Sequence, residues 1–461
     1  MSLYQKLYGF LPVGLQNLAV SGYGYFWKKR RFGGVFLQKV KEFKDRNFFS
    51  YDQWIDYQEK ELRKLLVHAF SFVPYYNKIY SQCGIRLNDL QNFRIEQLKY
   101  LPIIEKETLR KIGGTELLST KRSSGRKFFS SSGSTGTPVR ILYSKYMHQS
   151  WSAAYEVRCR NWAGVTYDAP RAMIGGRRVV HGNPGKSPFH RINWFEKQVY
   201  LSIFHLSKEN FSHYYKAIKE NNVEYVVGYS SSIYLMARFL LELGYPKLKL
   251  KAVIGSSEKL THSMKAIISS AFQCQVYDTW SGIEACALIS EHSDGNLYIS
   301  PDCGIIEFLD RDHNPVDYGS EGEMICTGLL NYDQPLIRYR IGDIGIPLAP
   351  LINQKIQMPR VKEIVGRTDD IITLRDGRKL SSFNRFFADL KGLKEVQVIQ
   401  IDYDRFILNV VPDLDFDDSD KEALILSLRE RLGRVHVEIS FVDHIPRGKN
   451  GKFKAVISHI R

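Results

Sequence analysis

The sequence lacks the features of disulfide-rich, zinc-binding and membrane-spanning proteins. Its six cysteines stand singly and form no Cys-x-x-Cys pair, which argues against a disulfide framework or zinc module and suits a reducing compartment. No apolar run approaches the roughly 18 residues that cross a bilayer. The first residues also lack the layout of a signal peptide. We therefore predict a cytoplasmic protein.

The chain has fewer acidic than basic residues. It has 65 Lys and Arg against 49 Asp and Glu, a formal net charge of +16. Such a balance favours anionic partners, which include nucleic acid, membrane surfaces and polyanionic substrates. No zinc finger, RNA-binding aromatic signature or long basic tail is present, so nucleic acid is not the expected partner.

The densest cluster of positive charge lies near the N-terminus. Lys28 to Arg31 follow a stretch rich in aromatic residues that includes Phe10 and Phe26. Aromatic residues beside a basic run suit a membrane interface, which would make residues 1–50 a membrane-facing extension with peripheral membrane association. The alternative is a helix packed on the main body, with a solvated basic end.

Apolar periodicity predicts an α/β fold. Residues 51–72 carry apolar side chains on one helical face, and after residue 127 strand and helix patterns alternate. Strands are expected at 223–227, 250–254 and 275–279, with helices at 231–243 and 263–272. This alternation indicates a largely parallel sheet with helices on its faces.

Two later changes of pattern divide the chain. From Gly304, short strands are expected at 305–308, 324–326 and 337–339, which suggests a smaller β unit. The last segment is expected to form a hairpin of 396–401 and 405–411, a helix at 421–432 and a strand at 436–442. We therefore predict a large N-terminal domain of residues 1–365, with mostly parallel sheets plus a small β unit. A small mobile α+β domain would follow at residues 366–461.

Residues 130–138 form a loop of serine, threonine and glycine that ends in proline. Such a loop offers hydroxyl donors and a backbone that can turn its N–H groups onto an anion, of which phosphate is the obvious example. The flanks at 127–129 and 139–143 look like paired strands, which disfavours a flexible linker. No lysine follows Gly136, so the loop is not a Walker A motif.

Four further segments follow in a fixed order. They are Trp280–Glu284, Arg338–Asp343, Gly366–Asp370 and Pro446–Lys452. Each by itself is weak, because a lone Gly-Asp or Gly-Lys pair is usually a turn.

Together with the serine loop, these segments resemble the motifs of the adenylate-forming superfamily of acyl-CoA synthetases and luciferases. Within it, the chain is similar to the phenylacetate-CoA ligase branch, and most to relatives found with capsular and surface-polysaccharide biosynthesis. The segments that carry this closer resemblance are 31–34, 73–76, 101–103, 228–230 and 335–340. The resemblance covers essentially the whole chain.

The resemblance implies an ATP-dependent, AMP-forming ligase. A carboxylate and ATP are both anions, so their reaction requires positive charge and hydrogen-bond donors. Lys452 matches the catalytic lysine, and Glu284 matches a catalytic glutamate that binds Mg²⁺. Arg367 would contact the nucleotide, and Asp369 would be the pivot of the hinge between the domains.

The resemblance also implies a set of residues that bind ATP and AMP. Asp343 would accept hydrogen bonds from the ribose hydroxyls, and Trp280 would stack on adenine. The complete set is Ser131, Ser132, Gly133, Ser134, Thr135, Gly136, Thr137, Ser256, Glu258, Asp278, Thr279, Trp280, Ser281 and Asp343.

Two positions depart from the superfamily pattern. Trp280-Ser281 stands where Tyr-Gly is usual, and Ser281 adds a side chain beside the expected substrate pocket. Ile341 replaces a common threonine and removes a hydrogen bond. The first departure suggests that the activated acid is unusual.

The second substrate is left open by the sequence. Transfer from acyl-AMP to the thiol of CoA would give a thioester, and transfer to an amine would give an amide. The acid would be a small molecule or a glycan carboxylate, and Arg171, Arg177, Arg178 and His181 could face an anionic glycan or CoA phosphates. Two alternatives stand: a phenylacetate-CoA ligase-type catabolic enzyme for aryl acids, and a catalytically silent, membrane-associated binding protein.

Overall fold

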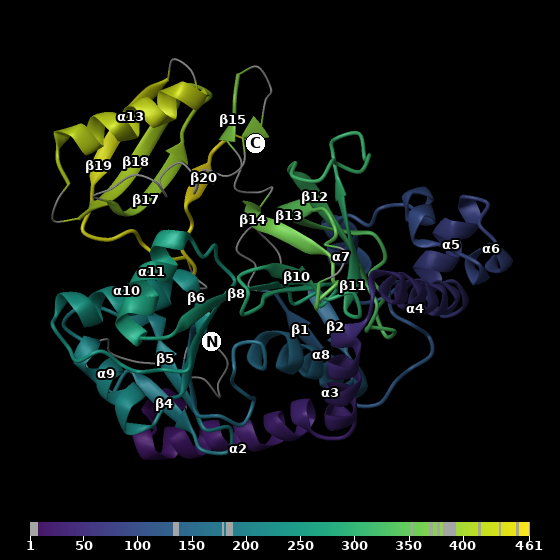
Figure 1. Cartoon of the computed structure of the whole chain (residues 1–461), viewed down its shortest axis with the longest axis horizontal. Coiled ribbons are helices and arrows are strands. Elements are labelled where there is room, and N and C mark those ends of the chain that lie inside the picture. Colours follow the sequence, from purple (N-terminus) through teal and green to yellow (C-terminus); the bar gives the residue numbers. More distant parts are fainter. Residues whose placement is uncertain are drawn as a thin grey trace.

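The computed structural model comprises a large body and a smaller C-terminal domain. The smaller domain lies at the top of Figure 1, with the body below it. The structure describes residues 8–131, 138–177, 179–180, 188–351, 354–367, 372–375, 379–380, 393–413, 416–432, 435–448 and 451–460. Among these residues, no helix has the length and apolarity needed to cross a bilayer.

Helices form the first part of the chain. The predicted helix at 51–72 is confirmed as α4, and Ser50 caps its first turn by accepting a hydrogen bond from the Gln53 N–H. Val73 ends α4, and Pro74 starts the next helix, where a missing N–H costs nothing. The helices of this region are α2 (Val13–Phe32), α3 (Phe36–Asp45), α4 (Tyr51–Phe72), α5 (Pro74–Gln82), α6 (Leu87–Gln91) and α7 (Lys106–Ile112), with short helical turns η1 (Arg46–Phe48) and η2 (Ile95–Tyr100).

A twelve-stranded sheet forms the centre of the body. Its strands in spatial order are β11 (Gly304–Leu309), β12 (Gly322–Gly328), β13 (Tyr339–Leu348), β14 (Arg360–Arg367), β10 (Leu297–Ile299), β9 (Leu288–Glu291), β8 (Gln275–Ser281), β7 (Ala252–Ser256), β6 (Tyr225–Tyr229), β3 (Arg171–Gly175), β5 (Gln198–Ser202) and β4 (His190–Asn193). The predicted α/β class is confirmed, and the strands expected near 223, 250 and 275 form β6, β7 and β8.

Parallel pairing is confined to one part of this sheet. Strands β5, β3, β6, β7 and β8 run parallel, and helices α9 (Phe211–Glu220), α10 (Ser230–Glu242) and α11 (His262–Phe272) connect or cover them. Strand side chains such as Val226 and Val253 pack with Ile233 and Met236 of α10 in one buried cluster. The parallel strands place their carboxyl ends at one edge, where ligands of such sheets bind.

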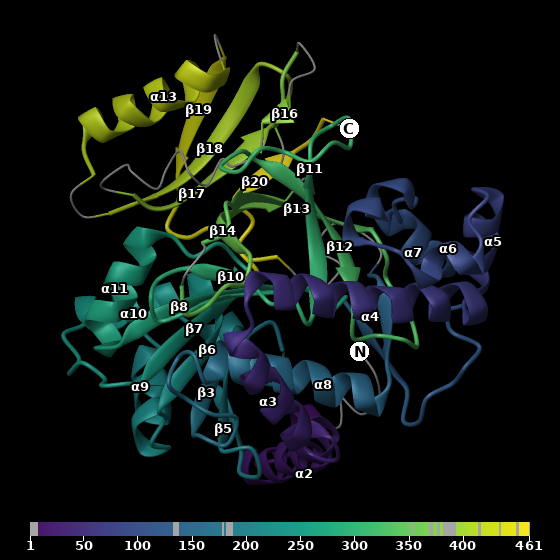
Figure 2. The ribbon, with the colours of Figure 1, turned by 45° about the vertical axis from the view of Figure 1, so that its right-hand side comes forward.

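The strands after Gly304 do not form a separate sheet. Strand β10 pairs with β14 through Leu297 and Val361, which joins β11–β14 to the parallel strands as the antiparallel end of the same sheet. Helix α4 packs on this end, where Leu62 and Leu65 share a core with Met324 and other strand residues (Figure 2).

The strand expected at 337–339 starts later than predicted. Arg338 has a positive φ of 49°, which is incompatible with a strand, so β13 begins at Tyr339. The Arg338 guanidinium instead donates to the Glu307 carboxylate at 2.9 Å and to the Leu101 carbonyl at 2.6 Å. A tertiary ion pair therefore overrides the local strand pattern.

The small domain has its own sheet and core. Strands β17 (Leu393–Gln400) and β18 (Arg405–Pro412) form the predicted hairpin, flanked by β19 (His436–Phe441) and β20 (Val456–Ser458). Helix α13 (Asp418–Leu432) packs Leu424 and Leu428 onto this sheet. A separate two-stranded sheet is formed by β15 (Ile372–Thr373) and β16 (Lys379–Leu380).

A buried ion cluster joins the N-terminal helices to the sheet. Asp302 is completely buried and accepts hydrogen bonds from Arg46 Nε at 2.9 Å and Arg158 Nη2 at 3.2 Å. Arg158, which lies in η3 (Glu156–Arg160) after α8 (Lys145–Tyr155), is also completely buried.

We expect Asp302→Ala to lower the free energy of unfolding by about 3–5 kcal/mol, because Arg158 would lose its carboxylate inside the protein. Chemical denaturation measures the change. Asp312→Ala, which removes an exposed carboxylate in the turn after β11, is the control and should be close to neutral. Equal stability of the two variants would contradict the prediction.

Candidate active site

The carboxyl ends of the parallel strands bring three predicted regions together. Tyr229 ends β6, Ser256 ends β7, and Trp280 lies at the end of β8. Tyr229 is paired with Ser256, and Ser256 with Thr279, so these residues stand side by side at one sheet edge.

Trp280 and Asp343 meet although 63 residues separate them in the chain. The indole Nε1–H of Trp280 donates to Asp343 Oδ2 at 3.2 Å, and Asp343 is buried. Asp343 pairs directly with Arg367 across β13 and β14. The Trp280 ring, the Asp343 carboxylate and the backbone of Arg367 are thus adjacent. The Arg367 side chain lies outside the described residues.

Glu284 is a buried carboxylate just beyond β8. The Tyr339 hydroxyl donates to its Oε1 at 3.4 Å. A Cβ on Gly282 would lie 2.4 Å from its Oε2, so this position accepts no larger residue without a shift. The Tyr143 hydroxyl donates to the Ile283 carbonyl at 2.6 Å, which ties the strand after the serine loop to the Glu284 turn.

The strands that flank the serine loop are paired as predicted. Strand β1 (Lys127–Ser130) runs antiparallel to β2 (Arg140–Tyr143). Beyond this ladder, Ser131 N–H donates to the Val139 carbonyl, and Val139 N–H donates to Ser131 Oγ, both at 3.0 Å. The Ser131 hydroxyl is therefore already an acceptor at the base of the loop. The other predicted loop residues, 132–137, lie outside the described residues.

Lys452 reaches this edge from the small domain. Its Nζ donates to the Ser257 carbonyl at 3.3 Å and lies 5.6 Å from the centre of the Tyr229 ring. Gly451 has a φ of 75°, and a Cβ there would come within 1.9 Å of the Ile203 side chain. Glycine is thus required before Lys452 by both backbone conformation and contact with the body.

Glu258 joins the two parts of the molecule. Its carboxylate accepts from Ser231 N–H at 2.9 Å and from Phe453 N–H at 2.8 Å. Ser257, the residue before it, has a positive φ of 68°. Glu258 therefore holds the segment next to Lys452 against the carboxyl edge of the body. Sequence patterns alone do not identify this structural contact.

The remaining predicted nucleotide contacts are dispersed along the same strands. Ser256 Oγ donates to the Gly228 carbonyl, and Thr279 Oγ1 donates to the Gly255 carbonyl. Burial raises the pKa of the Asp278 carboxyl to about 7, because the charged form loses contact with water. Ser281 is exposed at the strand end. The predicted pivot Asp369 lies outside the described residues.

The carboxylate of Glu284 is the candidate protein ligand for Mg²⁺ at this edge. In the described part of the chain, no three His, Cys, Asp or Glu side chains gather to hold a metal ion by themselves. Mg²⁺ bound with ATP usually takes one or two protein carboxylates, and phosphate and water oxygens supply the rest. A single buried carboxylate at the strand edge fits this mode of binding.

Beside this edge, one face of the sheet is exposed at Met173, and we call this exposed part the open face. Met173 lies in the middle of β3 between two neighbouring strands, yet 38% of it is exposed. It pairs with Tyr200 and Val227, so these three side chains share that face. Farther along the same face, a Cβ on Gly175 would lie 3.8 Å from the Tyr229 ring. Met173 thus lies on the same face of the sheet as Gly175 and the Tyr229 ring, which Lys452 contacts.

The basic residues Arg171 and Arg177, which were expected to face one ligand, lie at opposite ends of β3. Arg171 is buried and pairs with Glu196. The prediction that it faces an anionic ligand is therefore wrong. It stands at the start of β3, where the buried Glu196 stabilises its charge. Arg177, at the other end of β3, is exposed and donates to the Tyr200 hydroxyl at 3.2 Å. Arg178 and His181 lie outside the described residues.

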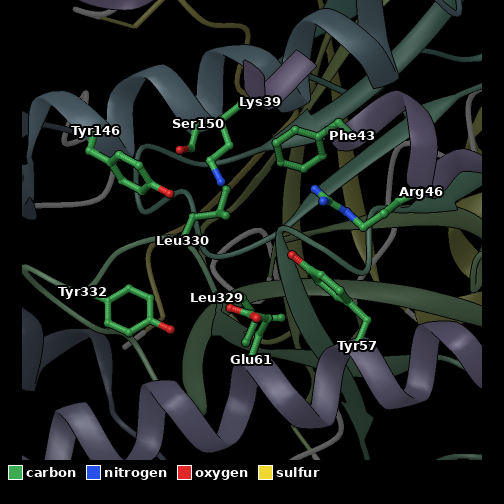
Figure 3. Close-up of a pocket in the computed structure, with 10 residues that line it drawn as sticks. All are labelled: Lys39, Phe43, Arg46, Tyr57, Glu61, Tyr146, Ser150, Leu329, Leu330 and Tyr332. Atoms are coloured by element: carbon green, nitrogen blue, oxygen red, sulfur yellow. The ribbon is translucent and has the colours of Figure 1, made fainter. Parts of the chain in front are cut away.

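A small pocket elsewhere in the body contains none of the predicted site residues. It lies between α3, α4 and α8, with the loop after β12, as Figure 3 shows. Its lining residues are Lys39, Phe43, Arg46, Tyr57, Glu61, Tyr146, Ser150, Leu329, Leu330 and Tyr332. Lys39 pairs with Glu42, and Arg46 pairs with Asp302, so both cations of the pocket already have carboxylate partners. We assign this pocket no part in the chemistry.

Sequence reasoning missed several residues of this edge. Tyr229 and Tyr339 contact the predicted lysine and glutamate, and Met173 marks the open face. The position of Tyr229 two residues after a predicted strand was a usable signal. Nothing in the local sequence distinguishes Met173 from a core residue.

Comparisons with known proteins find relatives over the whole length of the chain. Protein CapK of Staphylococcus aureus is 26% identical over 472 residues, covering 99% of each chain. The chain is homologous to CapK and to the phenylacetate-CoA ligases. Of the latter, the enzyme of Aromatoleum evansii is 23% identical, over 71% of this chain and 73% of its own. A model of the CapK C-terminal domain matches residues 373–459.

Solved structures show the same fold at lower sequence identity. The crystal structure of 2-hydroxyisobutyryl-CoA ligase, in the postadenylation state with an acyl-AMP, has a TM-score of 0.70 to this structure at 16% identity. The superposition covers 90% of this chain and 91% of that one. Body and small domain together therefore have the fold of an adenylate-forming ligase.

Proposed function

We propose that the protein activates a carboxylic acid with ATP and then transfers the acyl group. A carboxylate oxygen of the acid attacks the α-phosphorus of ATP, the bond to the bridging oxygen breaks, and pyrophosphate leaves with its electron pair. The acyl-AMP formed then reacts with a nucleophile, the thiol of CoA or an amine, and releases AMP. The homologous phenylacetate-CoA ligases support this class of reaction.

One observation carries the proposal: Lys452 of the small domain reaches the same strand edge as Trp280 and its partner Asp343. In the proposal, Trp280 stacks on adenine and Asp343 accepts from the ribose. Lys452 places a positive charge beside the phosphate, where negative charge develops as pyrophosphate leaves. Mg²⁺, held by Glu284 and the triphosphate, would neutralise charge on the leaving group. The serine loop would hold the β- and γ-phosphates.

The open face at Met173 is the place that we propose for the acid. It adjoins the Tyr229 ring and so the proposed position of the α-phosphate under Lys452. The acceptor is proposed to be CoA or an amine. The name of the homologue CapK supports an acid drawn from capsular or surface-polysaccharide biosynthesis, either a small molecule or a glycan carboxylate.

The test of the proposal is ATP–pyrophosphate exchange with a panel of acids that includes uronic acids, amino acids and aryl acids. Exchange that depends on an added acid supports the ligase. A preference for phenylacetate or benzoate would favour the aryl acid alternative instead. Absence of exchange with every acid, together with absence of ATP binding, would favour the catalytically silent alternative.

We expect Met173→Trp to block the open face. With the acid identified by exchange, it should lower kcat/KM for that acid by roughly 10–100-fold and leave the KM for ATP unchanged. Leu241→Trp, which is 37% exposed on α10, is a control of matched exposure. An unchanged kcat/KM for the acid in Met173→Trp would place the acid elsewhere.

A further inference from the structure

Helix α2 has an inverted polarity. The residues that it buries are Gln16, Ser21 and Gly24, whereas most of its large apolar side chains are exposed; Trp27 and Phe32 are half-buried. We call the exposed side chains Leu15, Leu18, Tyr25 and Phe26 the outer stripe; Phe26 is 73% and Leu18 57% exposed. At 100° per residue these positions fall on one side of the helix. A helix that packs on a sheet usually turns its apolar side toward the sheet and its polar side toward water. Helix α2 has the opposite orientation.

The edge of the large sheet explains this orientation. Strand β4 has a neighbour on one side only, and α2 satisfies its free backbone groups. Ile192 N–H donates to Asn17 Oδ1 at 3.0 Å, and Ser21 Oγ accepts from Trp194 N–H at 3.1 Å. Gln16 accepts from Arg191 Nε at 2.5 Å. The polar side of α2 must therefore face the sheet, which turns the outer stripe away from the protein.

The exposed apolar surface continues beyond the helix. Trp194 and Phe195, in the turn between β4 and β5, are each about half exposed. The Phe195 ring lies 5.2 Å from the Tyr25 ring. The outer stripe and these two residues together form the outer patch. Helix α2, which carries the outer stripe, lies along the lower side of the molecule in Figure 1, away from the small domain.

The charge around the outer patch is positive. No Asp or Glu occurs before Glu42, and Lys29 is exposed on the same helical side as the outer stripe. Lys28 and Lys197 share a single carboxylate, Asp168, at 2.8 and 3.1 Å. The patch therefore combines large aromatic and aliphatic side chains with excess positive charge.

The predicted basic run itself is only partly solvated. Arg31 is turned inward and pairs with the buried Glu196, and Arg30 donates to the Gly125 carbonyl at 2.7 Å. Burial lowers the pKa of the Arg31 guanidinium to about 10. With the Lys28–Asp168 pair, three residues of the run thus fix α2 to the body, as in the packed-helix alternative of the sequence analysis.

We propose that the outer patch docks on the surface of an anionic lipid bilayer, with α2 lying in the plane of the interface. Helices that bind in this way insert an apolar side into the boundary of the head groups and hold lysines against anionic lipid. Tyrosine and tryptophan are favoured at that depth because their rings are amphipathic. This docking does not depend on the proposed catalytic activity.

The test is flotation of the full-length protein with vesicles of phosphatidylcholine, with and without phosphatidylglycerol. We compare Leu18→Glu/Phe26→Glu with the control Tyr100→Glu/Leu426→Glu, whose residues are 68% and 60% exposed on other surfaces. Both double variants replace two exposed apolar residues and add two negative charges. Wild type and control should bind phosphatidylglycerol vesicles, and the outer-stripe variant should bind at least about tenfold more weakly. Lys29→Gln should weaken the binding about fivefold.

Several outcomes would overturn the docking. Vesicle binding of the outer-stripe variant equal to that of the control would show that the patch is not the contact. Equal binding of wild type to vesicles without phosphatidylglycerol would contradict the anionic surface. Light scattering would detect a dimer. If the wild type is a dimer that does not bind vesicles, and Leu18→Glu/Phe26→Glu is a monomer, the patch is a contact between two copies of the chain.

Discussion

Lys452→Ala is expected to lower the rate of ATP–pyrophosphate exchange by roughly 10²–10³-fold, with the fold unchanged. A unit charge about 4 Å from the developing phosphate charge contributes about 4 kcal/mol at an effective dielectric constant of 20. The Lys452 ammonium contacts the Ser257 carbonyl and the Tyr229 ring from the surface of the small domain, so its loss leaves no buried cavity. The effect should therefore fall on kcat.

Lys454 is the matched control for this variant. It lies two residues farther along the chain, and its backbone carbonyl accepts a hydrogen bond from Gln397 Nε2 that survives substitution of the side chain. Lys454→Ala should retain nearly full exchange and the same thermal stability as Lys452→Ala. Equal losses in the two variants would indicate a general charge effect, and unchanged exchange in Lys452→Ala would remove this lysine from the reaction.

Glu284→Gln is expected to lower exchange by about 10²-fold at limiting Mg²⁺, because an amide oxygen is a weaker ligand than a carboxylate. The substitution keeps the shape of the side chain and an oxygen that can accept from the Tyr339 hydroxyl. The loss should therefore be partly recovered when the Mg²⁺ concentration is raised.

The dependence on Mg²⁺ separates a ligand from a structural residue. Glu220→Gln, at the exposed end of α9, is the control and should show the wild-type dependence. If Glu284→Gln loses activity with an unchanged Mg²⁺ dependence, the carboxylate acts only by positioning its neighbours.

Much of the fold could be predicted because its signals are local. The helix at 51–72 follows from a single apolar face and a serine cap, and it appears at those residues. The hairpin of β17 and β18 follows from two alternating runs around a polar turn. The strand predicted at 337–339 was wrong at Arg338, whose positive φ accompanies a hydrogen bond to the distant Glu307 that the local sequence does not reveal.

The sequence proposes the residues of the candidate site and does not show how they assemble. The order of the motifs implied Trp280, Asp343 and Lys452, and the structure adds that Trp280 contacts Asp343 directly. Glu258 shows the limit, since its contact with Phe453 joins segments 195 residues apart. Such a contact has no local periodicity from which it could be inferred.

The sequence by itself determined the types of the elements, the order of the motifs and the chemistry that those motifs imply. These depend on spacing and residue type within short segments. Only the tertiary structure decided which side of α2 faces water. Apolar residues would ordinarily point inward, but the free backbone of β4 needs Asn17 and Ser21, so the leucines and aromatic rings face outward.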